Sequence, residues 1–477
     1  MGKQCRCGIT RRQFLHAAGG TIACWSLLPL SESILAADPL SRTPIFAKRK
    51  AQVTLVFTHV PSGSPTWPMK DYDYAGRSSE LAGKLKAACP GINFAVKTAH
   101  NAGEADAITK ESGDVDGYVV YLLGIWPWAI NSFARSGKPV VMVDDLFAGS
   151  GEALIMSGTA RREKLPLVSV CSSNFQDVVD GVRLFEVIRS MKGSKILDIV
   201  DYDITAPAEK IKANLGTTVV KVGSEELASY YSKADDREAA EWADHWIKQA
   251  KKVVEPTRED IVKSGKMYLA LCRAVTEKRA DAVTMDCLGM FYRGQVTAYP
   301  CLSHFQMNND GSTGVCEGDL NSTCTQLMMR YMTGRPGYVS DPVIDTARSE
   351  IIYAHCVSTN RVFGPKEKAN PYIIRSHAED GKGAVVQSLM PVNEVVTTLE
   401  TDVWNKRMVI HTGKTTRNVD EPKACRTKLA AKANADRILE NWGMGWHRVT
   451  VYGDWRERAI DLATLLGIEV FEEDKSA

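Results

Sequence analysis

Two carboxylates, Glu317 and Asp341, are the residues of this sequence best placed to do chemistry. Glu317 follows Gly314 to Cys316, a short apolar run that predicts a strand, and Asp341 ends a second predicted strand that begins at Tyr338. Such a pair can hold a hard divalent cation through oxygen while one of its members moves a proton. The alternative interpretation is that both side chains are cap and turn residues on a solvated rim.

A single strand-helix-strand unit is expected to position this pair. Residues 321–333 have helical periodicity, with Asp319 or Ser322 as the N-cap and Gly334 as the left-handed stop. Adjacent parallel strands lie about 4.8 Å apart, and open α/β sheets bind ligands beyond the carboxyl ends of their strands. If the two flanking strands are parallel neighbours, both carboxylates converge at that crevice.

Two histidines lie in glycine-punctuated loops, where a side chain can reach a cleft. His447 follows the run Asn441 to Trp446 and precedes a predicted strand. His377 lies in the polar segment 375–383, which would suit a hydroxyl-rich ligand. Each is alternatively a structural or surface histidine, and for His304 and His355, which have no comparable setting, the structural role is the one predicted.

Two tryptophans, Trp126 and Trp128, follow the predicted strand 118–123 and so belong to a loop at a strand end. Tryptophan faces stack on the apolar faces of sugar rings. This pattern predicts a sugar contact, with a subunit contact and plain packing as the alternatives.

Strand and helix signals alternate along most of the chain, which predicts an α/β fold with parallel sheets. Short apolar runs place an N-terminal α/β domain at residues 50–193, and the pattern restarts near Ser194 for a second α/β domain at 194–350 that carries the carboxylate pair. From residue 351 the helical periodicity gives way to alternating segments, so residues 351–477 are predicted to form a β-rich domain.

The first 37 residues differ from the rest and predict a twin-arginine export signal. Arg11 and Arg12 precede an apolar run from Ala17 to Leu30, and small residues follow at Ala36 and Ala37. The apolar run is short for a membrane span, so a removed signal and a periplasmic destination are favoured over an anchor. Lipid attachment at Cys24 is a further, less favoured alternative.

Composition excludes several classes of protein. With 44% hydrophobic and 24% charged residues, the 477-residue chain is neither disordered nor collagen-like. Its 59 basic and 57 acidic residues leave no surplus of positive charge for a phosphate backbone, which argues against a nucleic-acid partner. The cysteines after residue 37 are odd in number and lack CxxC spacing, so they predict neither a disulfide framework nor a structural zinc site.

Taken in order, several of these segments resemble the L-fucose isomerase-like family. The resemblance covers most of residues 118–472 and is densest after Ala280. It implies two doubly wound α/β domains followed by a C-terminal domain with a β-barrel, an oligomeric subunit, and manganese or a similar divalent ion. In that family two carboxylates bind the metal and transfer protons, and Glu317 and Asp341 match them, while His447 matches the metal-ligand histidine. The segments that carry the resemblance are Val315-Cys316-Glu317-Gly318-Asp319-Leu320, Thr333-Gly334-Arg335-Pro336, Asp341, Ala354-His355-Cys356, the 376–383 loop and the closing run 441–447.

The hypothesis that follows is a divalent-metal-dependent aldose-ketose isomerase that works through an ene-diol on a small-molecule sugar. Two alternatives remain open, an exported sugar-binding or accessory protein without turnover and a metal-dependent sugar epimerase. Family isomerases are mostly cytoplasmic, and an export signal departs from that pattern. The family's substrate-contact residues do not map cleanly onto this chain, so the sequence names no sugar.

Overall fold

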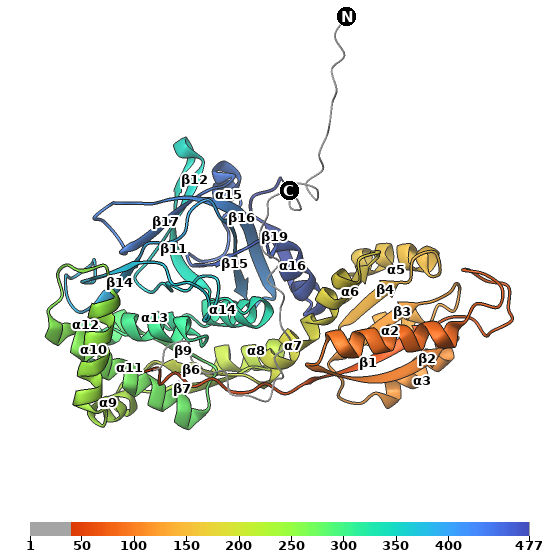
Figure 1. Cartoon of the computed structure of the whole chain (residues 1–477), viewed down its shortest axis with the longest axis horizontal. Coiled ribbons are helices and arrows are strands. Elements are labelled where there is room, and N and C mark those ends of the chain that lie inside the picture. Colours follow the sequence, from red (N-terminus) through yellow and green to blue (C-terminus); the bar gives the residue numbers. More distant parts are fainter. Residues whose placement is uncertain (1–39, 477) are drawn as a thin grey trace, which may run out of the picture. The chain divides into compact units, whose positions relative to one another are not determined.

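The computed structural model describes residues 40–476, whose strands form three open sheets and a closed barrel (Figure 1). The export signal predicted for residues 1–37 lies outside these described residues. Within residues 40–476, no helix is both long and apolar enough to span a bilayer.

The first sheet, sheet A, is entirely parallel, with the strand order β2-β1-β3-β4-β5. The central strand β3 is buried along its whole length, as expected for a strand with helices on both faces. Tyr118 and Val120 pack with the helices on one face, and Val119 and Tyr121 pack with those on the other. The strands are β1 (Ala51–Thr58), β2 (Ile92–Ala99), β3 (Gly117–Leu122), β4 (Val140–Asp144) and β5 (Leu167–Val170), and the helices are α2 (Tyr74–Ala88), α3 (Ala102–Glu111), α4 (Ile130–Ala134), α5 (Ser150–Glu163), α6 (Phe175–Val182) and α7 (Leu184–Gly193).

The second parallel sheet, sheet B, has the order β10-β9-β6-β7 and positions Glu317. Leu197 and Val283 face a cluster that includes Trp242 and Trp246, whereas Val315 faces a cluster that includes Leu327. The strands are β6 (Lys195–Ile199), β7 (Thr218–Val222), β9 (Ala282–Met285) and β10 (Gly314–Cys316), and the helices are α8 (Thr205–Leu215), α9 (Ser224–Ser232), α10 (Asp236–Gln249), α11 (Arg258–Lys278), α12 (Cys287–Tyr292), α13 (Cys301–Asn309) and α14 (Leu320–Thr333).

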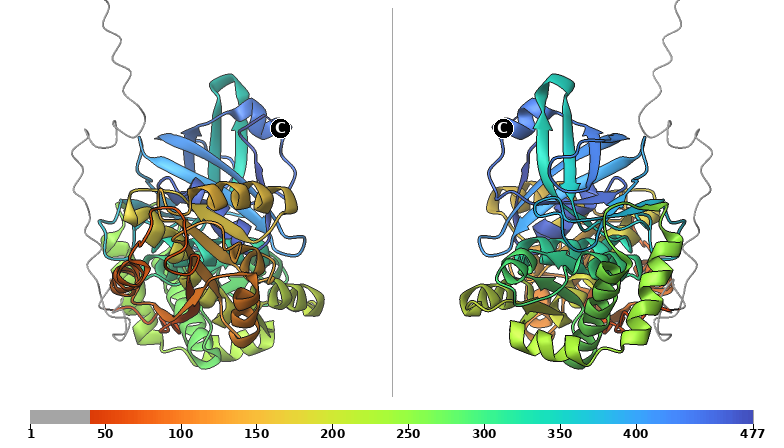
Figure 2. Two further views of the ribbon diagram at one scale, coloured as in Figure 1. Left: turned by 90° about the vertical axis from the view of Figure 1, so that its right-hand side faces the viewer. Right: turned by 90° about the vertical axis from the view of Figure 1, so that its left-hand side faces the viewer.

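The C-terminal part contains a six-stranded antiparallel barrel, which β15 and β16 close by pairing with each other. A closed barrel leaves no open strand edges. The β11–β12 hairpin projects from it (Figure 2). The barrel strands are β11 (Tyr338–Asp345), β12 (Glu350–His355), β15 (Val395–Asp402), β16 (Arg407–Asn418), β17 (Thr427–Lys432) and β18 (Arg448–Tyr452). Around them lie β19 (Glu469–Glu472), η1 (Thr346–Arg348), α15 (Ala435–Glu440), α16 (Arg456–Leu465) and a small third sheet of β8 (Lys252–Val253), β13 (Tyr372–Arg375) and β14 (Val385–Ser388).

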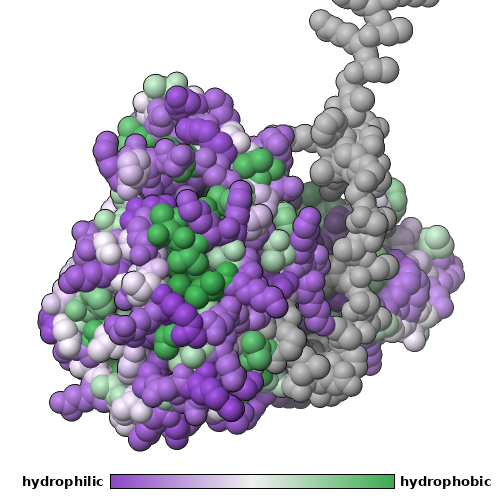
Figure 3. Space-filling view, turned by 60° about the vertical axis from the view of Figure 1, so that its left-hand side comes forward, coloured by the Kyte–Doolittle hydropathy of each residue, from purple (hydrophilic) through white to green (hydrophobic). Residues whose placement is uncertain are grey.

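The surface seen in Figure 3 is mostly hydrophilic, with one band of apolar residues near its centre. The apolar side chains gather mainly in four buried clusters that follow the sheets and the barrel. This distribution is what burial of apolar area in several cores produces.

The parallel sheets and the C-terminal barrel confirm the predicted α/β architecture and are compatible with the fold implied by the resemblance. The domain boundaries at residues 50–193, 194–350 and 351–477 stay predictions.

The predicted parallel pairing of the two strands around Glu317 and Asp341 is wrong. Among the described strands, β10 pairs only with β9, whereas β11 pairs antiparallel with β12 and β18 of the barrel. Helix α14 therefore links sheet B to the barrel, and it packs against β9 on one side and against β15 and β18 on the other. Local periodicity predicts that a strand exists, but it does not specify the partner of that strand, which depends on segments distant in the sequence. Strand β11 pairs with antiparallel partners, and this pairing buries its backbone groups.

Candidate metal centre

Four side chains converge where sheet B meets the barrel: Glu317, Asp341, His355 and His447. Each offers one ligand atom, and these four atoms all lie within 4.8 Å of one another. Glu317 follows β10, Asp341 lies within β11, His355 ends β12, and His447 immediately precedes β18. Residues more than a hundred positions apart in the sequence thus meet at one point.

Glu317 holds its position through an unusual backbone conformation. Its φ of 70° is in the left-handed region, and Gly318 follows with a φ of 65°. These two residues turn the chain from β10 into α14. A Cβ at Gly318 would lie 2.9 Å from the hydroxyl oxygen of Tyr202, the movable end of an exposed side chain, so it is the left-handed φ that favours glycine there. Strain of this kind at a non-glycine residue is typical of functional sites.

Strand register brings Asp341 to the two histidines. Asp341 is opposite Ala354, which places His355 beside it, and Ser340 is opposite Arg448, which places His447 on its other side. The Asp341 Oδ1 atom lies 3.0 Å from Nε2 of His447. Its Oδ2 atom accepts a hydrogen bond from Sγ of Cys425 at 3.5 Å.

Asp319 orients His447. As the N-cap of α14, Asp319 accepts a hydrogen bond from the backbone N–H of Ser322, and its Oδ2 atom lies 2.7 Å from Nδ1 of His447. Nδ1 therefore carries a proton, and Nε2 is directed at Asp341 and at Oε2 of Glu317, which is 3.5 Å away. A carboxylate behind a histidine in this way fixes the ring and its tautomer for metal binding.

His355 has the opposite proton arrangement. Its Nδ1 atom accepts hydrogen bonds from the backbone N–H groups of Cys356 at 2.9 Å and Val357 at 3.3 Å. The ring proton of neutral His355 is therefore on Nε2, which lies 3.7 Å from Oε1 of Glu317 and has no hydrogen-bond partner among the described residues. His355 thus offers the site a buried N–H donor, whereas His447 presents Nε2, which can carry a proton or, once that proton is displaced, bind a cation.

The electrostatics of the site favour ionised carboxylates. Burial opposes charge on Glu317 and Asp341, but hydrogen bonding to His447 and the nearby histidine charges outweigh it and lower both pKa values. Burial also opposes charge on His447, yet Asp319, Asp341 and Glu317 together raise its pKa to about 12. The three carboxylates therefore strongly stabilise a positive charge at Nε2 of His447.

The donor set fits a divalent cation. Two carboxylate oxygens and one imidazole nitrogen suit manganese, iron, cobalt or zinc, and the oxygen-rich character favours the harder ions of this group. The spacing of the ligand atoms of Glu317, Asp341 and His447 allows these three to reach one ion. The protein would hold the ion through Glu317, Asp341 and His447, with the N–H group of His355 beside it.

A cavity of about 540 Å³ opens beside these ligands. Acidic, amide and aromatic side chains form much of its wall, a composition that suits a hydroxyl-rich ligand. Trp446 is 62% exposed at the rim, and its indole N–H donates to the Pro342 carbonyl oxygen. The lining residues are Glu317, Asp319, Asn321, Glu400, Asp402, Trp404, Asn405, Met444, Gly445, Trp446 and His447.

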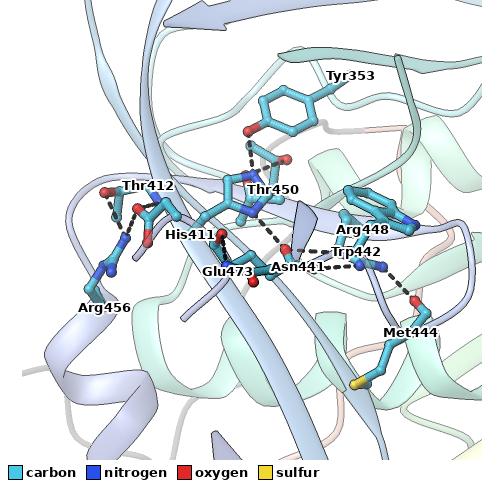
Figure 4. Close-up of polar contacts among 12 residues, drawn as sticks. Tyr353, His411, Thr412, Asn441, Trp442, Met444, Arg448, Thr450, Arg456 and Glu473 are labelled. Carbon is cyan, nitrogen blue, oxygen red and sulfur yellow. Dashed lines mark hydrogen bonds and ion pairs between the residues drawn. The ribbon is translucent and has the colours of Figure 1, made fainter. Parts of the chain in front are cut away.

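A buried ion-pair network braces the loop that carries His447 (Figure 4). The guanidinium of Arg448 donates to the backbone carbonyl oxygens of Met444 and His447 at 2.6 and 2.8 Å, and to Glu473 at 2.6 Å. Glu473 is also 2.9 Å from Nδ1 of His411, whose other ring nitrogen is 2.9 Å from the Tyr353 hydroxyl. The end of the chain thus fixes the metal-site loop from inside the barrel.

The structure brings together three of the predicted site residues and leaves three elsewhere. Glu317, Asp341 and His447 meet in the cluster. His377 is buried in the loop after β13 and stacks on Tyr299 at 4.6 Å. Trp126 and Trp128 stack on each other at 5.2 Å beyond β3 in sheet A, and neither is among the residues that line the cavity. Their predicted contact with sugar stays a prediction.

Sequence reasoning missed His355, Trp404 and Trp446, and it assigned His355 a structural role. The sequence signal for His355 was the segment Ala354-His355-Cys356, which is part of the family resemblance, whereas its place in the site depends on the pairing of β11 with β12. For Trp446 the signal was adjacency to His447 in the tryptophan- and glycine-containing run that precedes β18.

Comparisons with known proteins find similarity to two proteins that are named as isomerases. It is 24% identical over 306 residues to a protein named sulfoquinovose isomerase from Priestia aryabhattai, and equally to one of the same name from Priestia megaterium. The match covers 60% of this chain and 66% of each relative, just under two thirds of their length. No protein-family model matches the chain.

Proposed function

We propose that this protein is a divalent-metal-dependent aldose-ketose isomerase acting on a sugar. The observation that carries the proposal is the convergence of Glu317, Asp341 and His447 on one point beside a cavity lined by carboxylates, amides and tryptophans. The similarity to proteins named sulfoquinovose isomerase supports the same class of reaction.

Isomerisation of an aldose to a ketose moves a proton from C2 to C1 and shifts the carbonyl from C1 to C2. A bound divalent cation would supply Lewis acidity for two neighbouring sugar oxygens. One ionised carboxylate, Glu317 or Asp341, takes the proton from C2, which leaves an ene-diolate with its negative charge on O1, and the hydroxyl proton of O2 then passes to O1. The proton is then returned at C1, and the N–H group of His355 is placed to donate to a sugar oxygen whose charge increases during the transfer.

The cavity wall favours an uncharged sugar over an anionic one. Asp319 and Asp402 line it together with Glu317. Carboxylates at close range repel an anion such as a sulfonate in a site of low dielectric. We therefore expect a neutral aldose to be converted with a higher kcat/KM than its 6-sulfonated counterpart, which is the kind of sugar that the name of the relatives specifies.

The test of the proposed function is interconversion of sugars in ²H₂O followed by NMR. The manganese-loaded protein should convert at least one neutral aldose to the matching ketose and incorporate solvent deuterium at carbon. Glu317→Gln and Asp341→Asn serve as matched variants that keep shape and lose charge. A 2-epimer as the sole product would contradict the isomerase assignment and indicate an epimerase. Saturable sugar binding without deuterium uptake would indicate a non-catalytic binding protein.

We also propose that the protein is exported by the twin-arginine machinery and acts in the periplasm. The paired arginines and the apolar run that follows them support this proposal. Changing Arg11 and Arg12 together to lysine should retain the precursor in the cytoplasm of its host. Normal export of that variant, measured by cell fractionation, would contradict the proposal.

A further inference from the structure

Glu400, in β15, is a buried carboxyl group that the proposed reaction does not use. Its side chain is 5% exposed in the wall of the cavity. Its Oε2 atom lies 3.1 Å from Oγ of Ser322. Its Oε1 atom is buried and has no hydrogen-bond partner among residues 40–476. An ionised carboxylate in this position would be nearly unsolvated.

The hydroxyl group of Ser322 limits which protonation states Asp319 and Glu400 can have at the same time. It has one hydrogen, yet its oxygen lies 2.7 Å from Oδ2 of Asp319 and 3.1 Å from Oε2 of Glu400. If both carboxyl groups were ionised, one of them would face only lone pairs of the serine oxygen. One of the two groups must therefore supply a proton of its own.

Asp319 is the better place for the negative charge. It accepts hydrogen bonds from the backbone N–H of Ser322, from the Ser322 hydroxyl and from Nδ1 of His447. Glu400 has the serine hydroxyl alone. Burial, with the charge of Asp319 adding to it, raises the pKa of Glu400 well above its ordinary value, although Arg448 and His447 face it and act in the opposite direction. Stable hydrogen bonding thus puts the extra proton on Glu400.

We propose that Glu400 is a positioning residue of the metal centre that works as a neutral acid. Its O–H group donates to Ser322 Oγ, Ser322 then donates to Asp319, and Asp319 keeps the ring proton of His447 on Nδ1. The chain from Glu400 through Ser322 and Asp319 to His447 leaves Nε2 of His447 for the cation. This inference rests on the proposed metal site for its purpose, but the protonation of Glu400 is measured without metal or sugar.

The first test is infrared spectroscopy of the metal-free protein at neutral pH. The difference spectrum between the wild type and Glu400→Gln should contain the C=O stretch of a protonated carboxylic acid. A matched control is Glu350→Gln in the same barrel, because Glu350 is paired with Arg417 at 2.9 Å and should contribute carboxylate bands alone. Carboxylate bands in the Glu400 difference spectrum would overturn the proposal, whatever reaction the protein catalyses.

The second test is binding of Mn²⁺, measured by calorimetry. Glu400→Gln keeps an N–H donor for Ser322 and should bind Mn²⁺ like the wild type, whereas Glu400→Ala should bind it roughly 10-fold more weakly or worse, the usual cost of losing support behind a ligand. Equal losses in both variants would show that Glu400 acts as an anion and would contradict the proposal. If Glu400→Gln fails to fold, Ser322→Ala replaces it in the infrared test, where the acid band should persist at a shifted frequency.

Discussion

Glu317 combines a left-handed backbone, an ionised side chain and a position between two histidines. A backbone strained in this way persists only where the surroundings hold it, here Gly318 and the start of α14. At the scale of single residues, Glu317 and Asp341 are therefore the groups whose charge matters most.

Removing either charge should abolish turnover without unfolding the protein. We expect Glu317→Gln and Asp341→Asn each to lower kcat/KM by at least about 100-fold, because proton transfer by a positioned group contributes that much or more. Steady-state kinetics with far-ultraviolet circular dichroism checks both halves of this expectation. The exposed Glu421→Gln is the control, and wild-type turnover in either site variant would disprove the assigned roles.

Glu152, in the first turn of α5, gives a pH-dependent prediction. Burial raises its pKa to about 7, with the backbone N–H of Trp128 opposing the shift. The folded state therefore binds more protons than the unfolded state between pH 4.5 and about 7, and the free energy of unfolding falls as pH rises through that window.

Glu152→Gln should thus stabilise the protein at pH 8, by up to about 3 kcal/mol, and change its stability little near pH 4.5. Urea unfolding at the two pH values measures the difference. Glu163→Gln on the same helix is exposed and should show no such contrast. An equal effect of Glu152→Gln at both pH values would contradict the argument.

How far the sequence predicts single residues depends on how local their signals are. Glu317 and Asp341 were predictable because each follows or ends an apolar run, and His447 because of its loop and its family resemblance. His355 was not, since its place in the site depends on the register between β11 and β12. Register joins segments whose pairing no local pattern specifies.

At the scale of elements, the loop 441–447 depends on the last residues of the chain. Arg448 and Glu473 are both fully buried as an ion pair, and Arg448 also stacks on the Trp442 ring at 3.8 Å. Breaking a buried pair by removing one partner leaves an unpaired charge, which costs about 3 to 5 kcal/mol.

Glu473→Gln should therefore destabilise the protein by a few kcal/mol and weaken metal binding, because the loop 441–447 loses the ion pair between Arg448 and Glu473 that supports it. Chemical unfolding and Mn²⁺ calorimetry measure the two effects. Glu440→Gln breaks the exposed Arg437 pair instead and should cost less than about 1 kcal/mol. A Glu473 variant as stable as the Glu440 variant would refute this role of the network.

The fold class was predictable because alternating strand and helix signals are local. Helix α14 has the predicted N-cap at Asp319 and the predicted stop at Gly334. The sheet to which β11 belongs was not predictable. A helix between two strands is equally compatible with a crossover within one sheet and with a connection between two different sheets. The carboxylates still converge, by antiparallel pairing in the barrel in place of parallel pairing in sheet B.

At the scale of the whole molecule, the site joins two parts of the fold. Glu317 comes from the end of sheet B, whereas Asp341, His355 and His447 come from the barrel. A cation held by both parts binds the folded state and not the unfolded one, so it stabilises folding by mass action.

Manganese should accordingly raise the melting temperature of chelator-treated protein. At a free concentration 100 times Kd the gain is about 2.7 kcal/mol, and a Glu317→Gln, Asp341→Asn double variant should show none. Differential scanning calorimetry with and without Mn²⁺ measures the shift. The same shift in the double variant would mean that the metal binds elsewhere.

The most direct test of the central claim is metal content and turnover measured on one preparation. Elemental analysis of the purified protein should show one divalent ion per chain, chelation should remove both the ion and sugar interconversion, and stoichiometric Mn²⁺ should restore both. The double variant at Glu317 and Asp341 should stay without metal and inactive. Turnover that survives removal of the metal, or full metal content in the double variant, would contradict the account.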